Sequence, residues 1–456
     1  MGSITSALLS SANTLEVLGN TFDTLENNIS NANTPGYARQ DVNLEAMAFD
    51  PTAGLSGGVE SGPLINSRSE YLEQAVRTQQ QFLGNAQQRA GDLGQIEPLF
   101  TLSSSGGVAN SLTAFFNSFS QLSVNPNDAT SRQAVLTAAD NVAASIQQTA
   151  SGIQQVQANI TSQTGTVVSQ INQLASEIAS INQQYESNAS SSQDAGLDAQ
   201  LHTALENLSQ LGNFTLISNN NGTYNVALGG QTMIVIGSNA QAISADAGAS
   251  GTTILDAQGN DVTSQITGGQ LGALVGEQNT TLPGYMASLN TFAQSLADTV
   301  NGQLSQGLDQ NGNAGAPLFS YDQPSDAAST IAVNPITPDQ IAAAASSAAG
   351  GNGNALAMAQ LATQPEINGF TFTQYYGNLA SQVGSDVQQA QQDSSLAQSQ
   401  LTQAETQRTA VSGVDLNAEA TQVMQFQQAY SAAGKLVSVL DGLTETIINA
   451  VQPVAA

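Results

Sequence analysis

The chain has 456 residues and no cysteine, and its 35 Asp and Glu residues against 7 Lys and Arg residues give a net charge of −28. This charge excludes nucleic acid as a partner, because phosphate contacts need clusters of Lys and Arg. The lack of cysteine excludes disulfides and thiolate metal sites, and no stretch is apolar over the roughly 18 residues that insertion into a membrane requires.

The first predicted element is a helix over residues 1–30 with one narrow apolar stripe. Its positions recur every three or four residues, which is typical of a helix that packs along another helix: Ile4, Leu8, Ser11, Leu15, Leu18, Phe22, Leu25 and Ile29. Ordering a residue costs roughly 1–2 kcal/mol, and a buried Leu, Ile or Phe returns about 1.5–3 kcal/mol. So thin a stripe cannot fold alone, and we expect the helix to need a partner.

An asparagine-rich segment follows this helix. Residues 27–40 read Asn-Asn-Ile-Ser-Asn-Ala-Asn-Thr-Pro-Gly-Tyr-Ala-Arg-Gln. Pro35 disfavours helix at the residue before it, and Asn31 and Asn33 tolerate the left-handed conformation that ends helices. Pro35 and Gly36 suit the centre of a type II turn, and Tyr37 offers an aromatic anchor. A helix stop followed by a surface turn would also satisfy this pattern.

The middle of the chain is predicted to be mainly helical, with one change of period. A long coiled-coil-like seam, in one helix or in two helices in line, runs from Val135 to Tyr185. Short β-rich runs then lie between residues 212 and 266: Phe214–Ile217, Tyr224–Leu228, Met233–Ile236 and Thr252–Leu255. Helix returns over 269–306 with a break at Leu282-Pro283-Gly284, and residues 307–370 are expected to be mostly loop with a short helix near Ile341.

The last predicted element is helical from Phe372 to the end, apart from an interruption at Ser412-Gly413. Its final part again carries a narrow stripe: Leu416, Ala420, Val423, Phe426, Tyr430, Ala433, Val437, Leu440, Leu443, Ile447 and Val451. The simplest partner for this helix is the first helix, and the next is the same pair in neighbouring subunits. We expect both ends to be loose in the monomer and to order on assembly; an ordinary helical pair in a monomeric core remains the alternative.

The predicted fold class is therefore mainly α with an inserted small β domain, long coiled-coil-like helices, and paired N- and C-terminal helices. Residues 1–63 and 405–456 form the expected terminal helical assembly domain. Residues 64–211 and 267–404 form the helical middle domain, and residues 212–266 form a small outer β-rich insertion.

Few residues suggest chemistry. The single histidine, His202, is expected at the surface or at its boundary, and the single lysine, Lys435, on a solvated helix face. Asp309–Asn313 resembles the start of a calcium loop, but Ala314 and Ser320 replace the glycine and the acid that such a loop needs, so a polar turn is the better interpretation. No metal, no cofactor and no enzymatic activity are predicted.

Both ends of the chain resemble a known superfamily. The motif over residues 27–40 and the segments Ser412–Ala420 and Phe426–Tyr430 resemble bacterial flagellar axial proteins of the rod, hook and hook–filament junction. Internal stretches are similar to the hook-associated protein 1 family in particular: Leu122–Asp128, Gly269–Leu274, Thr281–Tyr285 and Asn311–Gly315. The family usually carries an Arg-Asp pair in the helix before the β insertion, where this chain has Ala199–Thr203.

The resemblance implies a structural subunit that forms the junction ring between hook and filament by packing of its terminal helices. The implied partners are further copies of the chain in a ring-like homo-oligomer, the hook protein, the second hook–filament junction protein, and a flagellar export chaperone on residues from about 415 to 451. It also implies an extracellular place in the flagellum, reached through the type III export apparatus. The N-terminus has no Lys or Arg before Arg39 and no compact apolar block, so no cleaved signal peptide is expected.

The expected assembly interface combines both stripes with the asparagine-rich segment. Its residues are Leu15, Leu18, Phe22, Leu25, Ile29, Asn31, Asn33, Pro35, Gly36, Tyr37, Val423, Phe426, Tyr430, Val437, Leu440 and Ile447. The alternatives are a hook or distal-rod subunit, a secreted acidic calcium-binding adhesin, and a secreted hydrolase, which would need a convergent pair of acids.

Overall fold

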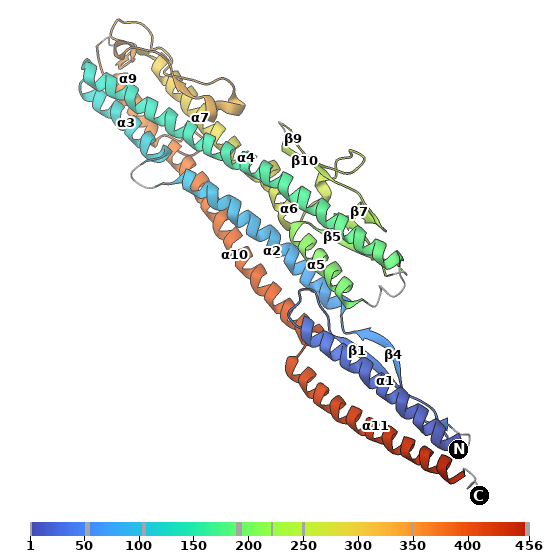
Figure 1. Ribbon diagram of the computed structural model, residues 1–456. Coiled ribbons are helices and arrows are strands. Elements are labelled where there is room, and N and C mark those ends of the chain that lie inside the picture. Colours follow the sequence, from blue (N-terminus) through green and yellow to red (C-terminus); the bar gives the residue numbers. More distant parts are fainter. Residues whose placement is uncertain are drawn as a thin grey trace.

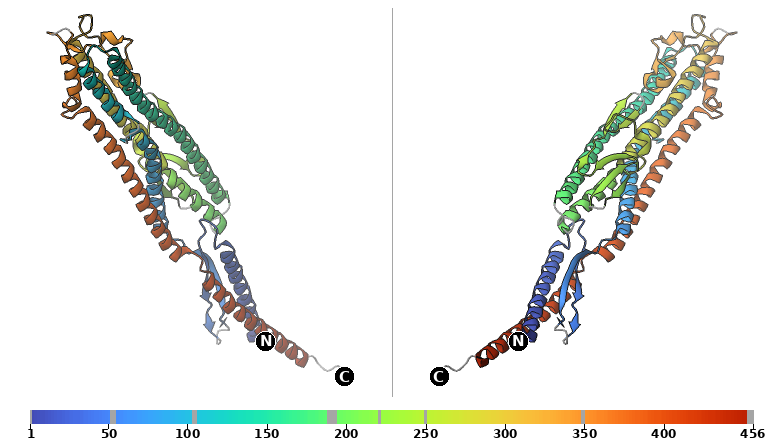
Figure 2. Two further views of the ribbon diagram at one scale, coloured as in Figure 1. Left: turned by 90° about the vertical axis from the view of Figure 1, so that its left-hand side faces the viewer. Right: turned by 90° about the vertical axis from the view of Figure 1, so that its right-hand side faces the viewer.

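The computed structural model describes residues 2–50, 55–102, 106–187, 194–219, 222–248, 251–347 and 350–451. These residues form a long helical rod that continues at one end into a thinner arm, where both termini lie (Figure 1). Figure 2 shows the same two parts from two further sides. None of the described helices has a stretch long and apolar enough to span a membrane.

Helices of very different lengths build the rod. They are α2 (Glu70–Ile96), α3 (Val108–Val124), α4 (Ala129–Ser187), α5 (Ala195–Leu211), α6 (Gly269–Gly276), α7 (Leu282–Ser305), α8 (Ala327–Thr330), α9 (Gly353–Gln360) and α10 (Phe372–Ser412). The long predicted seam is one unbroken helix, α4, of 59 residues. The largest side chains of the rod's core are aromatic and pack ring against ring, among them Phe115, Phe119, Phe292, Phe372 and Tyr376.

Side chains fix the starts of several rod helices. Asp128 accepts a hydrogen bond from the Ser131 backbone N–H (2.8 Å) just before α4, and Asp194 accepts bonds from two N–H groups in the first turn of α5. Thr371 and Gln374 form a reciprocal capping box at the start of α10. Each cap satisfies backbone donors that have no partner inside the helix.

The four predicted β runs are all strands. A four-stranded antiparallel sheet has the order β5 (Phe214–Ser218), β6 (Tyr224–Leu228), β7 (Thr232–Ile236) and β8 (Asn239–Ala240), and a hairpin of β9 (Ser244–Gly248) and β10 (Gly251–Leu255) follows it. The sheet lies against the C-terminal half of α4 (Figure 1). Its buried residues Val226, Ile234 and Val235 belong to the same apolar core as the helices. The Asn182 amide of α4 donates to Tyr224 O (2.8 Å) and Gly237 O (2.7 Å).

Two segments of the rod differ in detail from the sequence prediction. The chain does not leave the helical path at Leu282-Pro283-Gly284: a π-helical turn, Glu277–Thr281, leads directly into α7, and Pro283 is the second residue of that helix. Residues 307–370 are mostly irregular, as expected, but they include α8 and α9, and the short helix near Ile341 is a 3₁₀ turn over Pro338–Gln340. Short strands pair here as β11 (Gly307–Leu308) with β14 (Ala344–Ala345) and β12 (Phe319–Ser320) with β13 (Ala332–Val333).

The arm consists of α1 (Gly2–Asn31), α11 (Leu416–Val451) and a hairpin formed by β1 (Gln40–Ala46) and β4 (Val59–Asn66). The short strands β2 (Phe49–Asp50) and β3 (Leu55–Ser56) extend this hairpin. α1 lies between α11 on one side and the hairpin on the other, and it runs antiparallel to α11 (Figure 1). The predicted pairing of the terminal helices and the predicted interruption at Ser412-Gly413 are therefore confirmed.

Candidate assembly interface

The two terminal helices meet along the predicted stripes. Leu18 and Leu25 of α1 are buried, and Leu15 and Phe22 are half-buried. The rings of Phe22 and Tyr430 pack edge to face with centroids 6.2 Å apart. Such aromatic pairs add about 0.5–1.5 kcal/mol beyond the area that they bury, so this contact fixes the register of the pair.

The contact with α1 leaves much of α11 exposed to solvent. No apolar side chain of α11 is fully buried within residues 416–449, the part of the helix whose side chains the structure describes. Tyr430 is 44% exposed, and the other predicted interface residues of this helix are half-buried: Val423, Phe426, Val437, Leu440 and Ile447. Further apolar side chains of α11 are exposed, namely Leu416, Met424, Leu436, Val439, Leu443 and Ile448.

The end of α1 is built differently from the prediction for Asn31 and Asn33. Neither residue adopts a left-handed backbone; the left-handed position is Gly36, with φ of 72°. Asn31 instead donates from its side chain to Asn27 O (3.0 Å), while Asn33 and Pro35 are exposed. The predicted turn at Pro35-Gly36 is present, closed by a bond from Tyr37 N to the carbonyl three residues earlier (3.2 Å). A side chain at Gly36 would collide with Ala199 O, so the turn is pressed against α5.

Asn28 is the central residue of the asparagine-rich segment. Its Oδ1 accepts bonds from Gln40 N and from the Tyr37 hydroxyl, both 2.9 Å, and its Nδ2 donates to Gln40 O (2.8 Å) and to Glu419 Oε2 (3.4 Å). Asn28 and Glu419 are fully buried. Burial and the Glu419 carboxylate raise the pKa of Tyr37 to about 12, and burial raises the pKa of Glu419. One amide thus links α1, the hairpin and α11.

The sequence prediction missed Asn28 and Glu419. Both continue the stripes at the spacing of three or four residues, since Asn28 follows Leu25 and Glu419 precedes Val423. The signal available in the sequence was a polar residue at a position where the apolar stripe continues. Ile29, which was expected in the stripe, is 39% exposed because its neighbour Asn28 occupies the contact.

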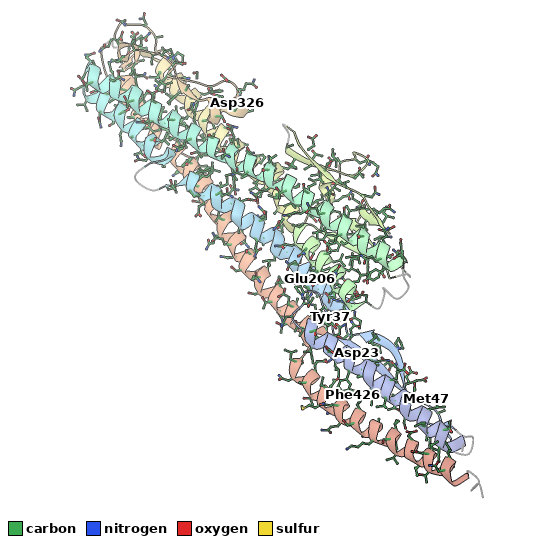
Figure 3. The ribbon with its side chains drawn as sticks, in the orientation of Figure 1. Asp23, Tyr37, Met47, Glu206, Asp326 and Phe426 are labelled. Carbon is green, nitrogen blue, oxygen red and sulfur yellow. The ribbon has the colours of Figure 1, made fainter. Side chains whose placement is uncertain are left out.

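A buried cluster of charges joins the arm to the rod. The Arg68 guanidinium donates to Gly36 O (2.6 Å) and pairs with Asp198 (2.6 Å) and Glu73 (2.7 Å). Arg408 of α10 pairs with Glu73 (3.3 Å) and with Glu206 of α5. These contacts connect the turn after α1 with α2, α5 and α10. Tyr37 and Glu206 lie at this joint, while Met47 and Phe426 lie further along the arm (Figure 3).

The prediction for His202 is wrong, because this side chain is 2% exposed inside the joint. Its ring nitrogens lie 3.6–4.0 Å from carboxylate oxygens of Glu70, Glu73 and Asp198. Burial, together with the neighbouring guanidinium groups, lowers the pKa of His202 well below its ordinary value. One face of α5 carries titratable residues at a spacing of four, namely Asp198, His202 and Glu206. Because only 9% of the residues of the chain are charged, this face was a usable signal in the sequence for a charged cluster. Lys435 is exposed, as predicted.

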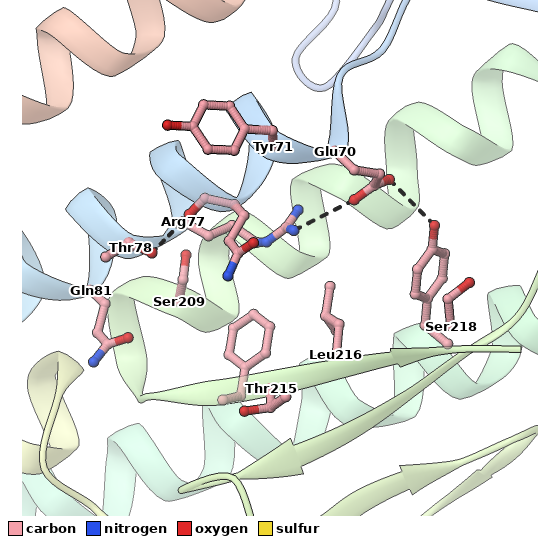
Figure 4. Close-up of a pocket in the computed structure, with 12 residues that line it drawn as sticks. Glu70, Tyr71, Arg77, Thr78, Gln81, Ser209, Thr215, Leu216 and Ser218 are labelled. Atoms are coloured by element: carbon pink, nitrogen blue, oxygen red, sulfur yellow. Dashed lines mark hydrogen bonds and ion pairs between the residues drawn. The ribbon is translucent and has the colours of Figure 1, made fainter.

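A pocket of about 510 Å³ lies beside the joint, between α2 and the edge of the sheet (Figure 4). Glu70 accepts a bond from the Tyr224 hydroxyl (3.4 Å) and pairs with Arg77 (3.7 Å) there. In the rod, Asp309 accepts bonds from the N–H groups of Asn311 and Asn313, both 2.8 Å, and so forms a polar turn. In the part of the chain that the structure describes, no three Asp, Glu or His side chains are grouped as a metal site would require.

Comparisons with known proteins agree with this architecture. Residues 93–319 match the family model of the flagellar hook-associated protein FlgK helical domain, and residues 406–450 match that of the flagellar basal body rod FlgEFG protein C-terminal. Flagellar hook-associated protein 1 of Bacillus subtilis is 26% identical over 94% of both chains. The protein of the same name from Salmonella typhimurium is 26% identical over 66% of this chain and 57% of that relative.

The solved structure of the flagellar hook junction protein FlgK from Burkholderia pseudomallei has the same fold. Its TM-score is 0.68 at 18% identity, over 75% of this chain and the whole of that chain. The family-model matches cover much of the rod, over residues 93–319, and nearly all of α11, over residues 406–450, and both models describe flagellar axial structural proteins. The chain belongs to the flagellar hook-associated protein 1 family, as its internal stretches predicted.

Proposed function

We propose that this chain is a structural subunit of the bacterial flagellum that forms the junction ring between hook and filament. Its arm packs against the arms of neighbouring copies. The observation that carries the proposal is α11, a helix of 36 residues with apolar side chains on more than one face and none of them fully buried within residues 416–449. A helix that touches one partner on one face leaves the rest of its apolar surface for other partners.

The outer side of α11 carries apolar surface that assembly can bury. Leu436, Val439 and Leu443 are each about half exposed. Completing the burial of such side chains contributes on the order of 1 kcal/mol each, and every subunit of a closed ring contributes the same set again. The strongly negative chain keeps single subunits apart by repulsion, so association requires this apolar contact.

The proposed neighbours follow from membership of the family. We propose the hook protein below the ring, the second hook–filament junction protein above it, and a flagellar export chaperone that covers α11 before the subunit leaves the cell through the type III apparatus. The uncovered face of α11 supports the last of these, because an exposed apolar helix needs protection in the cell. The terminal parts of the chain, residues 1–63 and 405–456, then serve as the assembly domain, residues 64–211 and 267–404 as the helical middle domain, and residues 212–266 as the outer insertion.

A matched pair of variants tests the assembly role. Leu443→Glu places a charge on the exposed side of α11, and Leu356→Glu places the same charge on α9, at the far end of the rod; the two leucines are 48% and 49% exposed. We expect Leu443→Glu to weaken self-association at least tenfold in sedimentation experiments and to abolish filament attachment in a motile host. Leu356→Glu should change neither. Unchanged association of Leu443→Glu would refute the role of α11.

A further inference from the structure

The pocket beside the joint is a slot between α2 and the strand β5 (Figure 4). α2 lines it from Glu70 to Gln81, and β5 lines the opposite wall. The Glu70–Tyr224 hydrogen bond lies near the end of β5. At the start of β5, Asn213 accepts a bond from Gly268 N (3.3 Å), and a side chain at Gly268 would collide with Gln81. The slot therefore follows the length of β5, and we call it the edge slot.

β5 has an unpaired side. It pairs with β6 alone and is the edge strand of the four-stranded sheet. Asn213, just before β5, accepts a bond from Gly229 N (2.8 Å), and bonded and non-bonded pairs alternate along an antiparallel ladder. The backbone groups that point away from β6 therefore belong to every second residue: Phe214, Leu216 and Ser218. Within the described part of the chain, these outward groups have no hydrogen-bond partner.

β5 also lacks the features that usually protect such an edge. Edge strands of soluble proteins commonly carry charges, a proline or a bulge, because free backbone groups attract other strands. β5 reads Phe-Thr-Leu-Ile-Ser, without a charge or a proline, and its pairing with β6 has no bulge. The opposite edge strand, β8, has only two residues. An extended peptide is the partner whose backbone matches a free strand edge.

Arg77 of α2 lines the edge slot and lacks an acceptor. It is 9% exposed, and its Nη1 atom has no hydrogen-bond partner among the described residues. Its ion pair with Glu70 is 3.7 Å long, which exceeds a hydrogen bond. A guanidinium offers five donors, and burying them without an acceptor is costly; burial accordingly lowers the pKa of Arg77, against the opposing effect of Glu70. The slot therefore favours an occupant that brings a carboxylate.

We propose that an extended segment of a partner protein binds in the edge slot as an added strand beside β5, with an acidic side chain paired to Arg77. The outward backbone groups of β5 bond to the backbone of this segment. Alternate side chains of a strand share one face, so the neighbours of the acid on that face contact Phe214 and Leu216, which are half-buried. The acid replaces the long pair with Glu70, whose side chain is 59% exposed. This site lies on the rod and is independent of the proposed packing of the arms.

A small set of peptides tests the site on the full chain. Six amidated hexapeptides alternate Thr and Val, each has Glu at a different position, and all carry fluorescein at the N-terminus. In anisotropy titrations we expect at least one peptide to bind and to slow hydrogen exchange over residues 214–218 at least threefold. Replacing its Glu by Gln should weaken binding at least tenfold. Methylating every second backbone nitrogen should abolish binding in one phase and spare it in the other, because only one set of N–H groups faces β5.

Matched variants of the chain locate the bound peptide. Ser218→Pro removes an outward N–H of β5, and Ala240→Pro places the same residue on β8, the opposite edge. Arg77→Gln removes the guanidinium from the slot, and Arg39→Gln removes one from the arm. We expect Ser218→Pro and Arg77→Gln to weaken binding at least tenfold and the two controls to change it less than twofold. Because Arg77 has no acceptor, Arg77→Gln should unfold at no lower urea concentration than the wild type.

The outcomes decide between this site and others. Binding of none of the six peptides at millimolar concentration would overturn the edge slot. Binding that survives both Arg77→Gln and Ser218→Pro, or that both methylation phases abolish equally, would overturn an added strand at β5. Leu443→Glu, which alters only the outer side of α11, should bind the peptide as the wild type does, so that the edge slot and the assembly role can fail separately. Circular dichroism of each variant verifies that it is folded.

Discussion

The Nδ2 atom of Asn28 lies 3.4 Å from Oε2 of Glu419, a hydrogen bond between residues 391 positions apart. Both side chains are fully buried in the arm. Among the described residues of the arm, Phe22 and Tyr430 form the one contact between aromatic rings. One polar contact and one aromatic contact therefore set the alignment of α1 against α11. Its outer apolar surface is left for neighbours.

Replacing Asn28 with alanine should loosen the arm. The change removes the bonds to Gln40 and Tyr37 and leaves the Glu419 carboxylate buried without this donor, which costs about 2–3 kcal/mol. We expect hydrogen exchange over residues 416–451 to accelerate at least tenfold, measured by mass spectrometry. Asn27→Ala, at the exposed neighbouring position, is the control and should change exchange less than twofold. Equal effects of the two variants would contradict the central place of Asn28.

Replacing Arg68 should lower the free energy of unfolding more than replacing any other basic residue of the chain. Removing a partner from a buried ion pair costs about 3–5 kcal/mol, and Arg68→Ala leaves Glu73 and Asp198 without their shortest contact. Arg39→Ala breaks only the half-exposed pair with Asp41, worth about 0–1 kcal/mol. Urea unfolding followed by circular dichroism measures both. A loss below about 1 kcal/mol for Arg68→Ala, the range of an exposed pair, would show that Arg408 alone can hold the joint.

Glu277 should make the rod less stable as the pH rises. Burial raises the pKa of Glu277 to about 7, although Arg89 lies 3.3 Å away. Because the folded-state pKa exceeds the ordinary value of 4.5, the folded chain binds the extra proton. This stabilising contribution is complete below pH 4.5 and is lost between pH 4.5 and about 7.

Glu277→Gln should remove this loss and raise the free energy of unfolding at pH 8 by on the order of 1–3 kcal/mol. Thermal unfolding of the two proteins between pH 4 and 8 measures the difference. Glu177→Gln, on an exposed position of α4, should leave the profile of the wild type unchanged. Parallel profiles for wild type and Glu277→Gln would mean that the folded-state pKa of Glu277 is not raised above its ordinary value of 4.5.

The arm should exchange its amide hydrogens faster than the rod in the monomer. α11 has no fully buried apolar side chain within residues 416–449, whereas α4 buries one at nearly every turn, and protection follows such burial. We expect fast exchange over residues 2–31 and 416–451 and slow exchange over residues 129–187. Assembly should then slow exchange in the arm. Full protection of the arm in the monomer would show that the seam alone stabilises it.

The sequence by itself determined the elements of this protein. The stripes at both ends predicted α1 and α11, the seam from Val135 to Tyr185 predicted α4, and the change of period predicted the strands of the sheet. These features are local, because the spacing of apolar residues and the placement of proline and glycine act on the neighbouring backbone.

Only the tertiary structure decided which polar residues meet. His202 was expected near the surface because its own helix shows only one apolar stripe, but α2 and α10 bring Glu73 and Arg408 against that helix and bury the ring. Asn28 likewise becomes central only when Glu419 arrives from the other end of the chain. Burial and pairing of such groups depend on residues far apart in sequence. A local pattern can mark a polar residue as out of step with its surroundings, but it does not identify the partner.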